Sequence, residues 1–204
     1  MTNPQNQLDQ IYNSYLNSIC PLITIYEVLA GNCPVAIMNE IRALFTHLAR
    51  DYTTKEPDIK EKEIHSAQRH LERILRDCFK YVCLAYEDQY REFILTYAHI
   101  DLTRVDNGDF LPVFKSCYTE AKNLFLEARK LEHCNTDDIA IRNAYELAFV
   151  AYTKMYALIS GNNISKFVHI RRKMAIREKL NYGIGILGLI GSLITIYSFL
   201  FSGN

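Results

Sequence analysis

The C-terminal part of this chain constrains it most, because residues 182–201 contain no charged side chain. A helix of that length is about 30 Å long, which matches the hydrocarbon thickness of a bilayer. Tyr182, Tyr197, Phe199 and Phe201 lie toward the two ends of the run, where aromatic rings favour the membrane interface. The run therefore predicts one transmembrane helix; the alternative is a buried helix at the end of a soluble core.

The charge pattern before this run predicts its orientation. Residues 165–180 carry six Lys or Arg against one Glu, a net charge of +5, whereas residues 181–204 carry none. The whole chain is neutral, so residues 1–164 carry a net −5. Because positive segments stay on the cytoplasmic side, we expect a single-pass protein of the inner (plasma) membrane with its N-terminus in the cytoplasm. The predicted parts are a helical sensor or regulatory domain (1–164), a basic juxtamembrane helix (165–180), and a transmembrane helix with a short external tail (181–204).

Composition excludes several other classes of protein. Overall neutrality argues against a protein that wraps nucleic acid through bulk positive charge. The six cysteines form no C-x-x-C pair and are scattered through helix-like patterns. Their even number leaves disulfides open, but this distribution is more typical of a reduced, cytosolic domain. The polar segment Met1 to Gln10 has no apolar core, so we expect no signal peptide.

Small and polar residues recur from just before the uncharged run at alternating steps of four and three residues, and Phe199 continues the spacing. The positions are Asn181, Gly185, Gly188, Ser192, Thr195 and Phe199. A 3.5-residue period winds helices into a left-handed bundle, and Gly and Ser allow membrane helices to approach closely. We therefore expect a homo-oligomer in the lipid bilayer, with a tetramer as one candidate, and a water-filled pore along this seam. A plain anchor is the alternative, since glycine is common in membrane helices.

The pattern of residues 1–164 predicts helices throughout. No stretch alternates with period two for long, and Gly and Pro signals are widely spaced. We expect an all-α fold, an elongated helical bundle followed by the transmembrane helix. The expected helices run from about Pro4 to Ala30 with a kink at Pro21, from Pro34 to Tyr52, from Pro57 to about Val105 as one helix or two, from Asp109 to about Glu132, from about Asp137 to Gly161, and from Asn163 or Ser165 onward.

Motifs for metal or cofactor chemistry are missing from the sequence. The six histidines include no H-E-x-x-H, and neither a phosphate-binding loop nor a nucleophile elbow occurs. We therefore predict no metal, no cofactor and no catalytic residue.

Basic side chains gather on two predicted helices that should pack antiparallel. These are Arg42, His47, Arg69, His70, Arg73 and Lys80. Brought together, such groups form an anion site in which arginine can bind phosphate in a bidentate manner. We expect the cluster to bind a nucleotide or a single-stranded oligonucleotide. The alternative is an interhelical ion-pair network of Glu40, Arg42, Arg73 and Asp77 that only stabilises the bundle.

Two strings in residues 34–85 resemble HEPN-like helical bundles of bacterial defence and toxin systems. In Asn39–Leu48 an arginine precedes a histidine by five residues, and Ala67–Lys80 repeats an apolar-framed histidine. In catalytic members such a pair cleaves RNA, so the resemblance implies a membrane-tethered ribonuclease using Arg42 and His47 as the alternative function. Ala43 stands where those nucleases usually have a polar residue, which favours a non-catalytic or nucleotide-sensing relative.

The overall layout is similar to that of single-span membrane effectors of bacterial anti-phage systems, including the Hailong-type membrane effectors. That resemblance implies a channel controlled by a DNA oligomer from a nucleotidyltransferase partner, and a role in abortive infection. We therefore expect a ligand-gated membrane effector and not an enzyme. A tail-anchored scaffold without a ligand is the third hypothesis.

Overall fold

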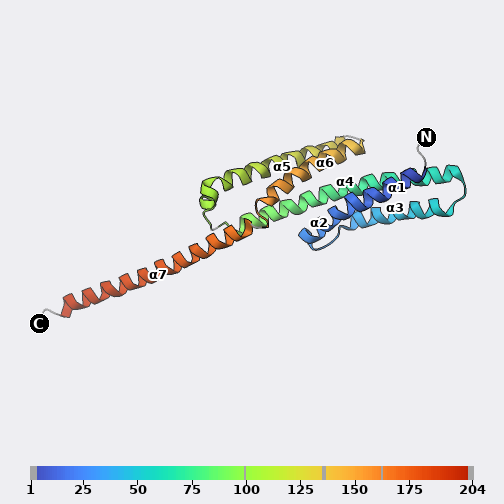
Figure 1. The fold of residues 1–204 in the computed structure, drawn as a ribbon. Coiled ribbons are helices and arrows are strands. Elements are labelled where there is room, and N and C mark those ends of the chain that lie inside the picture. The colour runs from blue at the N-terminus through green and yellow to red at the C-terminus, as the bar shows by residue number, and fades with distance from the viewer. Residues whose placement is uncertain (1–3, 99, 135–136, 162, 202–204) are drawn as a thin grey trace.

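The computed structural model describes residues 4–98, 100–134, 137–161 and 163–201. Within these ranges the side chains of 4, 5, 104, 178, 183, 190, 191 and 193–201 are not described. Every regular element in the described ranges is a helix, so the all-α prediction is confirmed. The molecule is elongated, with the bundle at the N-terminal end and one helix extending away from it (Figure 1).

The first helical segment contains a π-helical turn. Helix α1 (Pro4–Ser14) leads into the π turn η1 (Tyr15–Ile19), and α2 (Cys20–Ala30) follows directly. Pro21 is the second residue of α2, and because it has no N–H it removes one hydrogen bond from a helix that continues directly from the π turn. The irregularity that we expected at Pro21 is this π turn directly before it. Gly31, with φ of 73°, ends the segment in the left-handed conformation that glycine adopts at low cost.

Helices α3 (Val35–Thr53) and α4 (Pro57–Thr96) form an antiparallel hairpin. Pro57 opens α4 because its fixed φ suits the first helical position. The facing residues of the two helices are buried. They include Ile37, Leu44 and Leu48 on α3, and Ile64, Leu71 and Ile74 on α4. Helices α1 and α2 also pack on α4, so this 40-residue helix is the common support of the N-terminal half.

Helix α4 ends at Thr96, earlier than the predicted Val105. The chain then turns into the 3-10 segment η2 (Leu102–Gly108), whose start is capped by Asp101 accepting from the Thr103 N–H. Asp106, Asn107 and Gly108 all have positive φ. The sequence from 97 to 105 has no Gly or Pro, so its apolar pattern resembles a continuing helix, whereas tertiary packing of Ile100 and Val105 decides the break.

Helices α5 (Phe110–Cys134) and α6 (Asp138–Ala157) form a second hairpin beside α4 (Figure 1). Asp137 caps α6 by accepting from the N–H groups of Ile139 and Ala140. Ala121 and Ala128 of α5 and Tyr145 and Tyr152 of α6 are all buried in this part of the core. The ring of Phe125 on α5 has its centroid 5.8 Å from that of Tyr145 and 6.3 Å from that of Tyr152.

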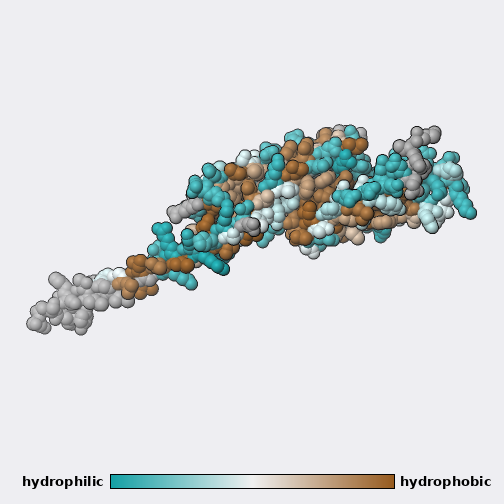
Figure 2. All heavy atoms as spheres, viewed as in Figure 1, coloured by the Kyte–Doolittle hydropathy of each residue, from teal (hydrophilic) through white to brown (hydrophobic). Residues whose placement is uncertain are grey.

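Helix α7 (Asn163–Phe201) runs without a break through the basic stretch and most of the uncharged run. It extends away from the bundle, and Figure 2 shows hydrophilic and then hydrophobic side chains along its described part. Within the portion of the chain that the structure describes, no helix is found that is both long and apolar enough to cross a membrane. The predicted transmembrane helix therefore stays a prediction.

Candidate functional site

A quartet of two histidines and two glutamates joins α3 to α4. Each helix carries a Glu followed seven residues later by a His, Glu40 with His47 on α3 and Glu63 with His70 on α4. Nδ1 of His47 lies 2.5 Å from Oε2 of Glu63, and Nδ1 of His70 lies 2.6 Å from Oε2 of Glu40. Because seven residues are two helical turns, the antiparallel arrangement pairs each His with the Glu of the other helix.

The two imidazole rings of this quartet stack at its centre. The centroids of His47 and His70 are 5.2 Å apart with an interplanar angle of 22°. The hydrogen bond from His47, aided by the charges of His47 and Arg50, lowers the pKa of Glu63. Both histidines thus use one ring nitrogen to hold the hairpin, which agrees with a structural role for this part of the predicted site.

Arg42 points away from the quartet. Five residues separate it from His47, which is an angle of about 140° around a helix. Its guanidinium donates to Asn39 Oδ1 at 3.1 Å, and it lines an open groove of about 630 Å³ with Phe45 and Arg50. The Arg–His pair that the HEPN resemblance suggested therefore lies on two different faces of α3.

Arg69 and Arg73 are neighbours one turn apart on α4. Arg69 donates to Ser66 Oγ at 3.4 Å, and neither arginine forms an ion pair with a described residue. Like charges at this spacing repel each other, and a bound anion would relieve that repulsion. Arg69 also lines a cavity of about 460 Å³ between α1, α4 and the start of α6, and the lining of this cavity includes two acids, Glu72 and Asp138, as well as His65 and Gln68. Like Arg42, these two arginines are predicted ligand-binding residues that no described acid pairs with.

Lys80 belongs to a different contact. Its ammonium lies 2.8 Å from Oε1 of Glu132 on α5, and Glu132 also accepts from the Tyr145 hydroxyl at 2.5 Å. Burial raises the pKa of Glu132, but hydrogen bonds from Lys80 and Tyr145 outweigh it, so the pKa is lowered overall. Lys80 thus joins α4 to the α5–α6 hairpin.

The interhelical ion-pair network that the alternative hypothesis described is present, but with other partners. Glu40 contacts His70, and Asp77 pairs with Arg76 at 3.3 Å, in place of the expected contacts with Arg42 and Arg73. Arg76 in turn donates to Asp138 of α6 at 3.1 Å. Interhelical polar contacts therefore do stabilise the bundle, through partners that the sequence spacing did not identify.

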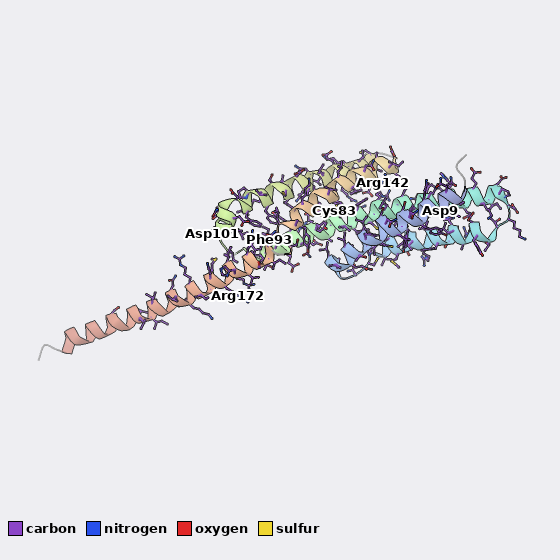
Figure 3. All side chains as sticks on the ribbon, viewed as in Figure 1. Asp9, Cys83, Phe93, Asp101, Arg142 and Arg172 are labelled. Carbon is purple, nitrogen blue, oxygen red and sulfur yellow. The ribbon has the colours of Figure 1, made fainter. Side chains whose placement is uncertain are left out.

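Sequence reasoning missed the aromatic cluster that holds the start of α7. The Phe167 ring, 1% exposed, has its centroid 4.9 Å from those of Phe93 and Phe110 and 5.4 Å from that of Tyr97. Beside it, the Lys166 ammonium lies 3.0 Å from Asp106 Oδ1. The labelled Phe93 and Arg172 in Figure 3 mark where α7 leaves the bundle. The apolar spacing of residues 167, 170 and 174 within the basic stretch was the available signal.

The described part of the predicted pore seam is exposed. Asn181, Gly185, Gly188 and Ser192 all face open space, and a Cβ added at either glycine would meet no atom within 4 Å. Ser192 donates to the Gly188 carbonyl. The side chains of the remaining seam residues, Thr195 and Phe199, lie outside the described residues.

No group of His, Cys, Asp and Glu among the described residues is arranged to hold a metal ion. All six cysteines are free, and burial raises the pKa of the Cys78 and Cys83 thiols well above the ordinary value. These two thiols are therefore poor nucleophiles.

The chain was compared with models of protein families, with curated proteins and with solved structures, and it matches none of them.

Proposed function

We propose that this chain is a membrane effector whose C-terminal helices assemble into a homo-oligomeric transmembrane pore. The cytoplasmic bundle gates that pore in response to a phosphate-bearing ligand, a nucleotide or single-stranded oligonucleotide. The layout, similar to that of anti-phage effectors, supports a role in abortive infection, with a nucleotidyltransferase partner as the source of the ligand.

One observation carries the membrane part of the proposal. The basic stretch and the uncharged run belong to a single unbroken helix, α7. Large apolar side chains on that helix have no packing partner among the described residues of the monomer. Their exposed fractions are 60% for Leu180, 60% for Ile184, 69% for Leu187 and 68% for Leu189. Such a surface is stable in lipid and costly in water.

The gating part is supported by two arginines of α4 that pair with no described acid. Arg69 and Arg73 lie on the helix that contacts both halves of the bundle, so a ligand held there touches the element common to both hairpins. The same α4 ends near Phe93 and Tyr97, which contact the start of α7. Ligand and pore would thus be linked through one rigid helix.

The experiment is reconstitution of the purified full-length protein into liposomes that contain a fluorescent ion indicator. Ion flux that scales with protein content is expected, and addition of single-stranded oligonucleotide should change it. If the protein inserts but liposomes stay impermeable with and without oligonucleotide, the helix is only an anchor and the scaffold hypothesis replaces this one.

A further inference from the structure

Helix α7 packs on the bundle with one narrow face. Phe167 is 1% exposed, and Ile170 and Met174 are partly buried against the same core. Their spacing of three and four residues places them on one side of the helix. Arg172 lies on the opposite side of the helix, Arg171 and Lys173 flank the docking face, and all three are exposed.

The same face continues into the predicted pore seam. From Met174 the steps of three and four residues run through Arg177 to Asn181, Gly185 and Gly188. At 100° per residue, all positions from 167 to 192 in this series fall within an arc of about 80°. The docking face and the seam are therefore one continuous stripe along α7.

The bundle thus occupies the cytoplasmic end of the surface that another copy of α7 would need. The aromatic rings of Phe93, Tyr97 and Phe110 fill the space directly over Phe167. A neighbouring α7 packed along the seam would meet this cluster before it could reach Ile170. Phe167, Ile170 and Met174 are themselves large apolar residues at heptad-like spacing, which is the pattern that packs between helices.

We infer that the docked bundle is an autoinhibitory contact, and that release of α7 from the aromatic cluster lengthens the helix–helix seam inward. This inference rests on the proposed membrane oligomer and names how that oligomer is controlled. In the docked state copies meet only beyond Arg177, through small residues. In the released state the large residues at 167, 170 and 174 join the interface between copies.

The Lys166–Asp106 ion pair gives the docked state a second, weaker contact. The two side chains are 48% and 49% exposed, so the pair itself contributes little. Asp106 and Asn107, however, hold a left-handed backbone that non-glycine residues seldom adopt. The contact therefore depends on a loop whose conformation is only modestly favoured, which suits a contact that must open.

The test uses disulfide cross-linking of the full-length protein in membranes. Met174→Cys reports contact between copies on the docking face, and Arg172→Cys is its control on the opposite side of the helix. Phe167→Ala weakens docking. Phe79→Ala is the matched control. It also removes one phenyl ring, but from the α4–α6 interface, where Phe79 contacts Phe149, so α7 is left untouched.

Phe167→Ala should raise the rate of cross-linking at Met174→Cys by roughly tenfold or more, since each 1.4 kcal/mol by which docking is weakened is a factor of ten. Ion flux in liposomes should rise with it. Phe79→Ala should change neither quantity, and Arg172→Cys should stay at the wild-type background. Ile170→Ala, a milder change on the same face, should act in the same direction as Phe167→Ala if the latter proves poorly folded by circular dichroism.

Gly188→Cys separates the two proposals. Cross-linking at Gly188→Cys without any rise at Met174→Cys in the Phe167→Ala and Ile170→Ala backgrounds would overturn the autoinhibitory contact and leave the oligomer standing. No cross-linking at Gly188→Cys in any background means that the copies do not assemble, and the proposed function itself fails. Equal effects of Phe167→Ala and Phe79→Ala would show a general loss of stability and also overturn the inference.

Discussion

Tyr152 on α6 donates its hydroxyl to Glu87 Oε2 on α4 at 2.8 Å, and both side chains are buried. Glu87 also accepts from Arg91 at 2.9 Å and from Tyr118 at 3.3 Å. Burial raises the pKa of Glu87, but the hydrogen bonds from Tyr152 and Arg91 and the positive charges of Lys122 and Arg91 outweigh it, so the pKa is lowered overall. The carboxylate is therefore ionised inside the bundle, and its donors are what make this tolerable.

Tyr152→Phe should destabilise the protein by about 1–3 kcal/mol, because it leaves a buried charged acceptor short of one donor. The expected fall in melting temperature is about 2–4 °C per kcal/mol for a chain of this size. Tyr156→Phe is the control, since that hydroxyl forms no hydrogen bond with a described residue. Equal melting temperatures for Tyr152→Phe and the wild type would mean that the hydrogen bond adds nothing.

Glu63 should make the hairpin of α3 and α4 sensitive to acid. Its pKa is lowered from 4.5 in the folded chain, so its stabilising effect is complete above pH 4.5 and disappears as the pH falls through the lowered value. Glu63→Gln should therefore be less stable than the wild type at pH 7 and equally stable in strong acid. Denaturant unfolding at several pH values measures this, with Glu61→Gln as the exposed control; a difference that persists in strong acid would contradict it.

Gly188→Leu should abolish assembly or conduction without disturbing the single chain. A Cβ at this position meets nothing within 4 Å, so any effect must come from contacts between copies. Expression of the wild type alone should depolarise cells, whereas Gly188→Leu should be harmless at equal protein level. Leu189→Ala, a change 100° around the helix from Gly188, should behave as the wild type does; two substitutions with the same effect would leave the helix a plain anchor.

Phosphate binding should depend on Arg69 and Arg73 and not on Lys80. When one cation that touches phosphate is removed, the slope of the logarithm of the binding constant against the logarithm of the salt concentration falls by about one unit. Arg69→Gln and Arg73→Gln should each lower this slope when binding of a labelled single-stranded DNA oligonucleotide is measured. Lys80→Gln removes the same charge but breaks the pair with Glu132, so it should lower stability and leave the slope unchanged. A lower slope for all three variants would indicate bulk electrostatics.

Purified protein should not cleave RNA. Arg42 and His47 lie on different faces of α3, and the Nδ1 of His47 is held by Glu63. Incubation of labelled RNA with the full-length protein should leave the substrate intact. Degradation that His47→Ala abolishes would establish the ribonuclease hypothesis instead.

Helix boundaries could be predicted wherever local chemistry decides them. Helix α4 begins at Pro57 because proline has a fixed φ that suits the first helical position, and α2 ends at Gly31 because glycine adopts a positive φ at low cost. Both are local properties of the residue and need no tertiary contact. The end of α4 at Thr96 could not be predicted, since it depends on the burial of Ile100 and Val105 in the core and not on a local signal such as Gly or Pro. Tertiary packing overrides the local pattern there.

In the candidate site, too, some contacts could be predicted from the sequence and others could not. The antiparallel hairpin could be predicted, and it brings His47 and His70 together. Lys80 could not be placed, because its partner is on α5 and no spacing within α4 reveals it. The partnership of Glu40 with His70 follows from the seven-residue repeat in both helices, a signal that is visible in the sequence only once the hairpin register is known.

Helix α7 also has a mechanical consequence. Its 39 residues form one rod of roughly 58 Å, anchored at one end chiefly by a single aromatic side chain. A tilt of only about 5° at that anchor would sweep the distant end sideways by about 4 Å, given 1.5 Å of rise per residue. If α7 pivots at Phe167, a slight rearrangement of the surrounding aromatic rings therefore moves the distant end of the helix by about the width of an ion.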